Sequence, residues 1–181
     1  EDLFPQICAA AVDAGGFDLA WIGLVDPVSL DVRSVAANGR ALDYIDGLRV
    51  SAHPDSPYAA GPTGLAIRER RPVWMTDIPN DSRTTPWRER VRENGWVAAV
   101  SNPLPLEGEA VGARTIYSKT DQGFDEDTRG LLVEMAADLS FALDVLARDA
   151  RREQAEQRLR QSEARYRTLF AESGVPMLLI E

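Results

Sequence analysis

Few side chains in this sequence are suited to covalent chemistry. Its 181 residues include one histidine, His53, and one cysteine, Cys8. Nucleophilic catalysis by a Ser-His-Asp or Cys-His arrangement requires a histidine beside the nucleophile, and His53 does not neighbour Cys8 in sequence. The sequence also contains no glycine-rich phosphate loop and no metal-ligand spacing beyond scattered carboxylates. It therefore predicts no enzymatic activity within these residues.

Both rare side chains have simple structural explanations. Cys8 falls on the apolar side of a helical pattern, where a small buried hydrophobe is expected. His53 precedes a proline in a polar loop and is expected to be exposed, so its alternative role as an axial haem ligand is disfavoured. A single cysteine excludes an internal disulfide, which favours a reducing, cytoplasmic location.

Side chains suited to binding gather in residues 61–106, which contain three of the four tryptophans. Ligand pockets are commonly lined by apolar and aromatic walls with a few placed polar groups. The same tryptophans would serve equally well as core residues, and both interpretations stay open. The candidate pocket residues are Trp21, Trp74, Asp77, Trp87, Trp96, Ser101, Asn102 and Arg114.

Turn residues divide this stretch into elements that could position those side chains. Glycine and proline mark the boundaries, while β-branched and aromatic residues mark the strands. The expected elements are a turn at 61–64, a helix at 65–70, a strand at 73–75, a helix at 87–94 closed by Gly95, and a strand at 96–104 ended by Pro103 and Pro105.

The flanking segments complete a mixed fold. Apolar residues at helical spacing predict a helix over 3–12, ended by two glycines. Residues 19–25 are continuously apolar and predict a central strand covered on both faces, in a hairpin with a strand at 32–37. A further strand is expected at 110–117. These elements place the chain in the α+β class, with a central antiparallel sheet flanked by helices and a long C-terminal helix.

Composition limits the partners. The formal net charge of −9 disfavours nucleic acid and anionic membranes, which attract a concentrated basic face. No apolar run approaches the roughly 20 residues of a membrane span, so no membrane contact is expected from this segment.

The order and spacing of several short motifs resemble the GAF domains of bacterial signalling proteins, over residues 1 to about 150. The resemblance implies a GAF-like sheet and a sensory domain that binds a small molecule. The matching pieces are Gly61-Pro62-Thr63-Gly64-Leu65-Ala66, Arg71-Pro72-Val73, Thr76-Asp77-Ile78, Pro86-Trp87-Arg88-Glu89-Arg90, Gly112-Ala113, Ile116-Tyr117-Ser118 and Gly123-Phe124-Asp125-Glu126-Asp127.

The same resemblance narrows the ligand. GAF domains that attach linear tetrapyrroles use a cysteine in the pocket region, and none lies there, which disfavours a covalent bilin. The free-methionine-sulfoxide reductases of this fold need several cysteines, and this sequence has one, which disfavours that activity. The pattern of cyclic-nucleotide-binding members is met only in part, by Ser118-Lys119 and Phe124-Asp125-Glu126. The identity of the small molecule stays open.

Arg114 departs from the family pattern, which carries an apolar residue at this point. Alternation along the strand places Arg114 on the same face as Ile116 and opposite Thr115. A buried arginine is costly unless it is paired. We therefore expect Arg114 to reach solvent at an edge of the sheet, or to meet a carboxylate or an anionic ligand.

Asp125-Glu126-Asp127 are expected to open a helix, because the helix dipole favours acidic residues at its N-terminus. An uninterrupted helical pattern then runs over 131–173. Its first half repeats apolar residues in steps of three and four and is expected to pack on the sheet or on a second copy. Its second half carries a thinner seven-residue stripe, which cannot bury itself alone and predicts a parallel homodimeric coiled coil. The expected dimer residues are Leu139, Leu146, Ala155, Leu159 and Tyr166.

Residues 162–177 resemble the opening of a PAS domain. The expected organisation is a GAF-like sensory domain at 1–147, a coiled-coil linker at 148–165 and the start of a PAS domain at 166–181. The chain begins without methionine, so we expect a fragment of a longer protein. Such architectures usually end in a histidine kinase or an enzyme of cyclic-di-GMP metabolism. The alternative is a ligand-free dimerisation and spacing module.

Overall fold

The computed structural model describes residues 3–120 and 124–172, except for the side chains of residues 146, 150 and 169–172. The chain divides into two units, Glu1–Ser140 and Phe141–Glu181. The elements are α1 (Leu3–Asp13), β1 (Leu19–Val25), β2 (Asp31–Gly39), η1 (Leu42–Tyr44), β3 (Val50–Ser51), α2 (Pro62–Glu69), β4 (Val73–Met75), η2 (Ser82–Trp87), α3 (Arg88–Glu93), β5 (Ala98–Leu106), β6 (Glu109–Ser118) and α4 (Glu126–Glu172).

The first unit is built on a six-stranded antiparallel sheet with strand order β3-β2-β1-β6-β5-β4. β1 lies inside the sheet between β2 and β6, and its first five residues are buried. The continuous apolar run at 19–25 therefore did predict a central strand covered on both faces, and the expected fold class is confirmed.

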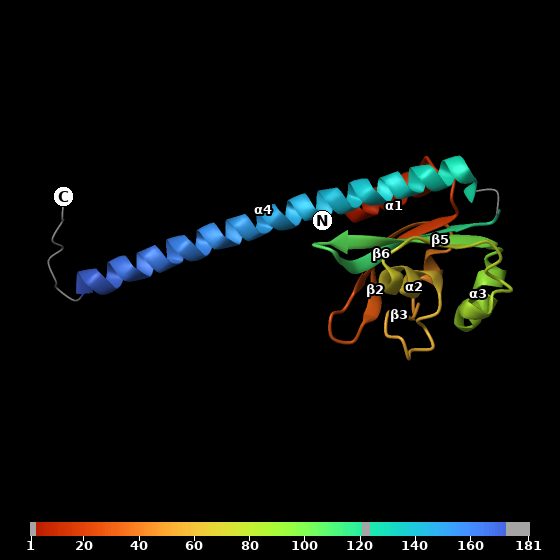
Figure 1. Cartoon of the computed structure of the whole chain (residues 1–181), viewed down its shortest axis with the longest axis horizontal. Coiled ribbons are helices and arrows are strands. Elements are labelled where there is room, and N and C mark those ends of the chain that lie inside the picture. The colour runs from red at the N-terminus through yellow and green to blue at the C-terminus, as the bar shows by residue number, and fades with distance from the viewer. Residues whose placement is uncertain (1–2, 121–123, 173–181) are drawn as a thin grey trace. The chain divides into compact units, whose positions relative to one another are not determined.

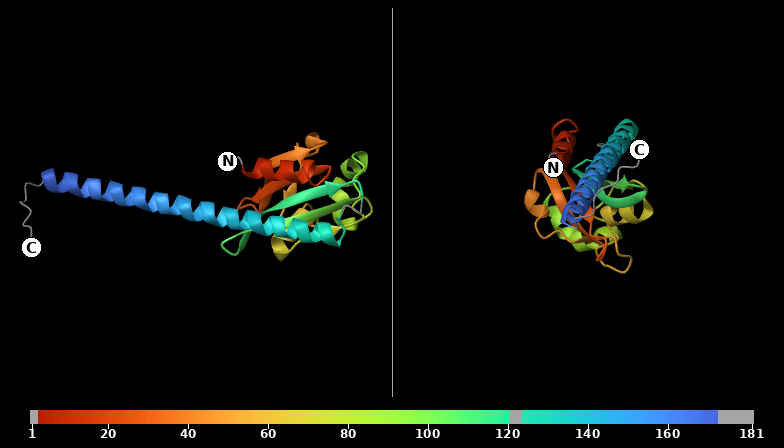
Figure 2. Two further views of the ribbon diagram at one scale, coloured as in Figure 1. Left: turned by 90° about the horizontal axis from the view of Figure 1, so that it is seen from above. Right: turned by 90° about the vertical axis from the view of Figure 1, so that its left-hand side faces the viewer.

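Helices cover both faces of this sheet (Figure 1). On one face lie α1 and the first turns of α4, which run side by side in the views of Figure 2 and line a mainly apolar groove. On the other face lie α2 and α3 together with the two 3-10 turns. Each strand consequently sends alternate side chains into two separate layers.

Two predicted boundaries are wrong. Residues 62–64, expected in a turn, form the first turn of α2. Pro103 and Pro105 do not end a strand but lie within β5. β4 pairs only with Ala99 to Ser101 of β5. The prolines lie beyond that paired part, so no β4 residue lies opposite them. Proline is tolerated at such an edge because its missing N–H removes no ladder bond. The sheet register shifts between Leu104 and Pro105.

α4 begins where expected, since the Thr128 N–H donates to the Asp125 carboxylate at 2.9 Å. Within the first unit Leu132, Ala136 and Leu139 are buried. Leu139 is 4% exposed in the single chain, so the domain core takes up a side chain that was expected to serve a dimer.

The described part of the second unit is helical throughout. Large apolar side chains at Phe141, Val145, Leu159 and Tyr166 are exposed there, as is Ala155. The side chain of Leu146 lies outside the described residues, as do residues 173–181 of the expected PAS start. No described helix is long and apolar enough to cross a membrane.

Candidate functional site

A cluster of aromatic side chains fills the layer between the sheet and α2. Tyr117 projects from β6 and stacks on Trp96, with ring centroids 4.6 Å apart. Tyr44, at the end of η1, packs edge to face with Trp96, with ring centroids 4.8 Å apart. The hydroxyl groups of the two tyrosines lie 3.3 Å apart and are hydrogen-bonded. Burial raises the pKa of both phenols, that of Tyr44 well above its ordinary value.

A second polar group lies in the same layer. The hydroxyl of Thr63, in the first turn of α2, lies 2.8 Å from that of Thr115 on β6. Thr115 is in turn 2.8 Å from the hydroxyl of Ser101 on β5. All three side chains are buried, so this chain of hydroxyls connects α2 to two neighbouring strands.

Trp21 completes the polar lining from β1. Burial raises the pKa of the Tyr117 phenol, while the neighbouring Tyr44 hydroxyl and the Trp21 indole N–H lower it. The same N–H forms no hydrogen bond of good geometry to a described residue, although Trp21 is 1% exposed. A buried N–H in this condition is available to a hydrogen-bond acceptor.

Residues 42–49 cover this layer, and we call them the cover segment. The Arg90 guanidinium donates to the carbonyls of Asp43 at 2.8 Å and Asp46 at 3.3 Å. It also lies over the ring of Tyr44. At the other end, the Trp87 indole donates to the Arg49 carbonyl at 3.0 Å. Two side chains from the η2–α3 region therefore hold the cover segment in place.

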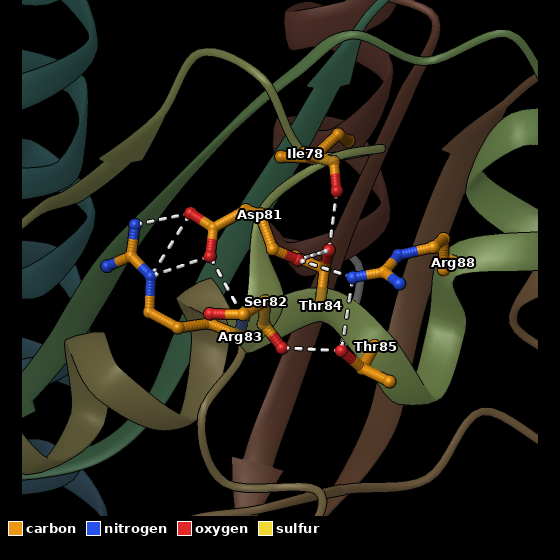
Figure 3. A network of polar contacts seen from close by, with 7 residues as sticks. All are labelled: Ile78, Asp81, Ser82, Arg83, Thr84, Thr85 and Arg88. Atoms are coloured by element: carbon orange, nitrogen blue, oxygen red, sulfur yellow. Dashed lines mark hydrogen bonds and ion pairs between the residues drawn. The ribbon is translucent and has the colours of Figure 1, made fainter.

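A network of polar contacts fixes the turn that presents Trp87 (Figure 3). Asp81 caps η2 by accepting from the Arg83 N–H at 2.9 Å, and its pKa is lowered chiefly by the Arg83 side chain. The buried Thr84 hydroxyl donates to the Ile78 carbonyl at 2.5 Å and lies 2.8 Å from the Asp81 carbonyl. Asp81 thus serves as the N-cap of η2.

The aromatic layer leaves little free space. The cavity among its side chains measures about 10 Å³, which is about the room of one water molecule. A wider and more open groove of about 530 Å³ lies outside it, along β2 and the cover segment. Leu48 lines both spaces, and so forms part of the wall between them.

The structure brings together only part of the predicted pocket. Trp21, Trp87, Trp96 and Ser101 line the layer beside α2, as described above. Asp77 is exposed and holds a turn by accepting from the Asn80 side chain at 3.0 Å. The three remaining residues, Trp74, Asn102 and Arg114, belong to the opposite layer.

Adjacent positions in a strand explain this separation. Ser101 and Asn102 follow one another in β5, so their side chains point to opposite faces of the sheet. Trp74 packs instead on Phe124, with centroids 5.6 Å apart, and under the Arg129 guanidinium. A single pocket cannot contain all eight candidates.

The expectation that Arg114 reaches solvent at an edge of the sheet is wrong. β6 lies between β1 and β5, so Arg114 is not at an edge, and its side chain is 0% exposed. Its Nη2 donates a hydrogen bond to the Leu132 carbonyl of α4, at 2.9 Å. No carboxylate pairs with it among the described residues. Thr115, its neighbour in sequence, faces the aromatic layer on the other side.

The sequence did not identify Tyr44, Thr115 and Tyr117 as site residues. Tyr117 was one of the motif residues. Thr115 lies opposite Trp21 and Ser101 on the two neighbouring strands, so it shares their face of the sheet. Tyr44 arrives from a segment with no strong periodicity, and only the folded chain shows its place. His53 is exposed, and the described residues contain no group of three potential metal ligands.

Comparison with known proteins agrees with this architecture. A family model described as the GAF domain matches residues 1–144. A comparison with curated proteins found no match.

Solved structures of bacterial proteins resemble the chain throughout the sheet. The GAF domain region of a protein described as a membrane protein of Geobacter sulfurreducens PCA is 21% identical, with a TM-score of 0.64, covering 79% of this chain and 91% of that one. A domain described as part of a two-component sensor histidine kinase of Sinorhizobium meliloti 1021 is 21% identical, with a TM-score of 0.62, covering 84% and 96%.

A free methionine-R-sulfoxide reductase of Neisseria meningitidis, solved in complex with its substrate, is 19% identical, with a TM-score of 0.61, covering 80% of this chain and 78% of that one. At these identities the likenesses show the fold alone.

Proposed function

Since this chain belongs to the GAF domain family, we propose that it is a sensory and regulatory input domain that binds a small molecule in the aromatic layer beneath the cover segment. The observation that carries the proposal is the set of polar groups buried there. Burying hydroxyls and an indole N–H costs free energy that an apolar core would avoid. A ligand that uses these groups explains their presence.

The lining indicates the chemistry of the ligand. The residues around the small cavity are aromatic, aliphatic or hydroxyl-bearing, and none is charged. The hydroxyls of Tyr44, Tyr117 and Thr63 can each donate or accept a hydrogen bond. We expect a small, uncharged and largely planar molecule with polar groups at its edge.

Binding requires the cover segment to move, because the closed cavity has room for only about one water molecule. The open groove along β2 lies on the other side of Leu48 and provides the route of entry. The ligand would select the conformation in which the cover segment is displaced, and the cost of that displacement would reduce its apparent affinity.

The signal would leave through α4. β6 sends Thr115 and Tyr117 into the aromatic layer, while Arg114, on the opposite face of the same strand, contacts α4. A ligand that repositions β6 would therefore change the contact with the helix. We propose that a dimer of α4 passes this change to an output domain, such as a histidine kinase or a cyclic-di-GMP enzyme.

The exposed side chains of the second unit support the dimer. Val145, Leu159 and Tyr166 are separated by multiples of seven residues, and Phe141 and Ala155 fall on the complementary heptad positions. Light scattering of the wild type and of Leu159→Glu tests this. We expect the wild type to be a dimer and the charge of Leu159→Glu to weaken it. A monomeric mass for both proteins would contradict the dimer.

A ligand-free dimerisation and spacing module is the second candidate. The observation that favours it is the close packing of the aromatic layer. The reductase activity of the Neisseria relative is not proposed for this chain, because Cys8 is its one cysteine and lies on the other face of the sheet, beside Arg114.

Native mass spectrometry with pools of uncharged aromatic compounds, amino acids and nucleotides separates the two candidates. The sensor predicts a mass increase with the first pool that weakens in Tyr117→Phe, which loses one hydroxyl and keeps the ring. Tyr166→Phe, which removes an exposed hydroxyl on α4, is the matched control. No adduct with any pool would support the spacing module.

A further inference from the structure

Arg114 is a charged side chain in the middle of the sheet. It lies on β6 opposite Ile22 of β1 and Asn102 of β5, with a strand on each side. Its guanidinium is fully buried and faces the layer that contains α1 and the first turns of α4. Proteins rarely bury arginine completely without a partner of opposite charge.

The guanidinium is only partly satisfied. Nη2 donates to the Leu132 carbonyl at 2.9 Å, whereas Nε and Nη1 have no hydrogen-bond partner among the described residues. A carbonyl is a neutral acceptor, so this bond does not balance the charge. Two strong donors therefore remain unused in the core.

Asn102 lies directly opposite Arg114 on the neighbouring strand. Paired residues have their Cβ atoms about 4.5–5.5 Å apart and share a face of the sheet. Asn102 is 0% exposed, and neither its amide nitrogen nor its amide oxygen has a partner among the described residues. The unused donors of two buried side chains thus occur side by side.

The surrounding helices supply no negative charge. The acidic side chains of α1 and of the first turns of α4 are all exposed. The buried Cys8 thiol is close enough to affect the pKa of Arg114. Burial raises the pKa of the thiol itself to about 11, so it is neutral at pH 7 and supplies no negative charge. Burial lowers the pKa of Arg114 to about 10, which leaves the guanidinium charged. An uncompensated buried charge costs several kcal/mol.

We propose that Arg114 and Asn102 bind a monovalent anion between the sheet and the helices α1 and α4. Arg114 Nε and Nη1 and the Asn102 amide would be its donors, and one negative charge would neutralise the guanidinium. This site is separate from the aromatic layer, which lies on the other face of the sheet. It would also hold β6 to α4, because the same guanidinium contacts Leu132.

An apolar groove lies between the two helices that cover the site, although neither Arg114 nor Asn102 lines it. It measures about 340 Å³, runs between α1 and α4, and is lined in part by Ala11, Leu132 and Met135. Leu132 is also the residue whose carbonyl accepts from Arg114. The anion could be an inorganic halide, or the carboxylate of a small acid whose apolar part lies in the groove. Both sources share the chemistry of one negative charge.

Thermal unfolding tests the site in solution. Chloride, bromide, acetate and butyrate are compared as sodium salts, with sulfate at matched ionic strength as the divalent reference. A ligand of the native state lowers the unfolding equilibrium constant by the factor 1 + [X]/Kd, about a hundredfold at 100 times Kd. A halide response alone indicates an inorganic ion, and a stronger response to butyrate indicates a carboxylic acid.

Arg114→Met is the test variant, and Arg71→Met, at an exposed site, is the control. The proposal expects the response to be lost in Arg114→Met and kept in Arg71→Met. Equal responses in all three proteins would overturn it. If Arg114→Met does not fold, Asn102→Leu takes its place, with a response reduced severalfold.

Crystals of the wild-type protein grown in bromide provide a test without variants. The expected result is an anomalous peak within hydrogen-bond distance of Arg114 and Asn102. Water molecules bridging the two side chains, with no anomalous signal, would show that hydration satisfies these groups and would contradict the anion site.

Discussion

The hydroxyl oxygens of Tyr44 and Tyr117 lie 3.3 Å apart inside the protein, although 73 residues separate them in sequence. One belongs to the cover segment and the other to the centre of the sheet. This contact therefore joins the part that must move for a ligand to enter to the strand that contacts α4.

The two buried phenols should ionise above the ordinary pKa of tyrosine. Burial raises the pKa of Tyr44 and Tyr117, so both remain neutral in the folded protein at pH values where the unfolded chain ionises. Stability is then fully present below about pH 10, the unfolded value, and falls as the pH rises further. Absorbance titration with parallel urea denaturation measures both effects. Four phenols that ionise together near pH 10 in the folded state would contradict the burial.

Loss of the Arg90 side chain should loosen the cover segment. Arg90→Met removes the donors to Asp43 and Asp46 but retains an apolar chain over Tyr44. Hydrogen exchange in residues 42–49 should become severalfold faster, because the segment loses two of its attachments. Arg92→Met is the control, since Arg92 donates to Pro79 and Asn80 instead. Equal exchange in the two variants would show that Arg90 does not hold the cover.

The close approach of α2 to the loop before it should make Gly64 sensitive to substitution. A Cβ at this position would lie 2.5 Å from the Ser51 carbonyl oxygen and 2.6 Å from that of Ala59. Because both obstacles are backbone atoms, Gly64→Ala should destabilise the fold by about 1–3 kcal/mol. The matched control is Gly130→Ala in α4, where nothing lies within 4 Å. That change should stabilise by about 0.5–1 kcal/mol, through helix propensity.

Urea denaturation of the two glycine variants supplies both values. A Gly64→Ala protein as stable as the wild type would mean that α2 can withdraw from Ser51 and Ala59 at no cost, which would also weaken the account of a tightly packed layer.

The sequence was most informative where a local pattern determines structure. The apolar run at 19–25 predicted a buried central strand, and Gly95, with φ of 68°, closes α3 as expected. The acidic residues from 125 onward correctly marked the start of α4. These features depend on neighbours in the chain, so periodicity and turn chemistry suffice to predict them.

The site depended on longer-range information. Aromatic content drew Trp74 and Trp96 into one predicted pocket, but the sheet separates them into two layers. The position of Pro103 within a strand follows from the short length of β4, which the sequence of β5 does not encode. The place of Tyr44 likewise follows from contacts with β6 and α3 that only the folded chain reveals.

The Cys8 thiol should be unreactive in the native state. It is fully buried, and burial raises its pKa to about 11, so little thiolate exists at neutral pH. An aromatic disulfide reagent should therefore modify it at the rate at which α1 opens, and rapidly in urea. Immediate reaction of the native protein would show that α1 is not packed on the sheet as described.

The measurement that tests the central claim most directly is a thermal-shift titration of residues 1–181 against uncharged planar compounds, with charged aromatic acids and nucleotides for comparison. A ligand that binds only the native state raises the melting temperature with its concentration. The account predicts such a rise for a member of the uncharged class and a smaller one in Tyr117→Phe. A melting temperature unchanged by every class would contradict a small-molecule site in the aromatic layer and leave the spacing module as the function.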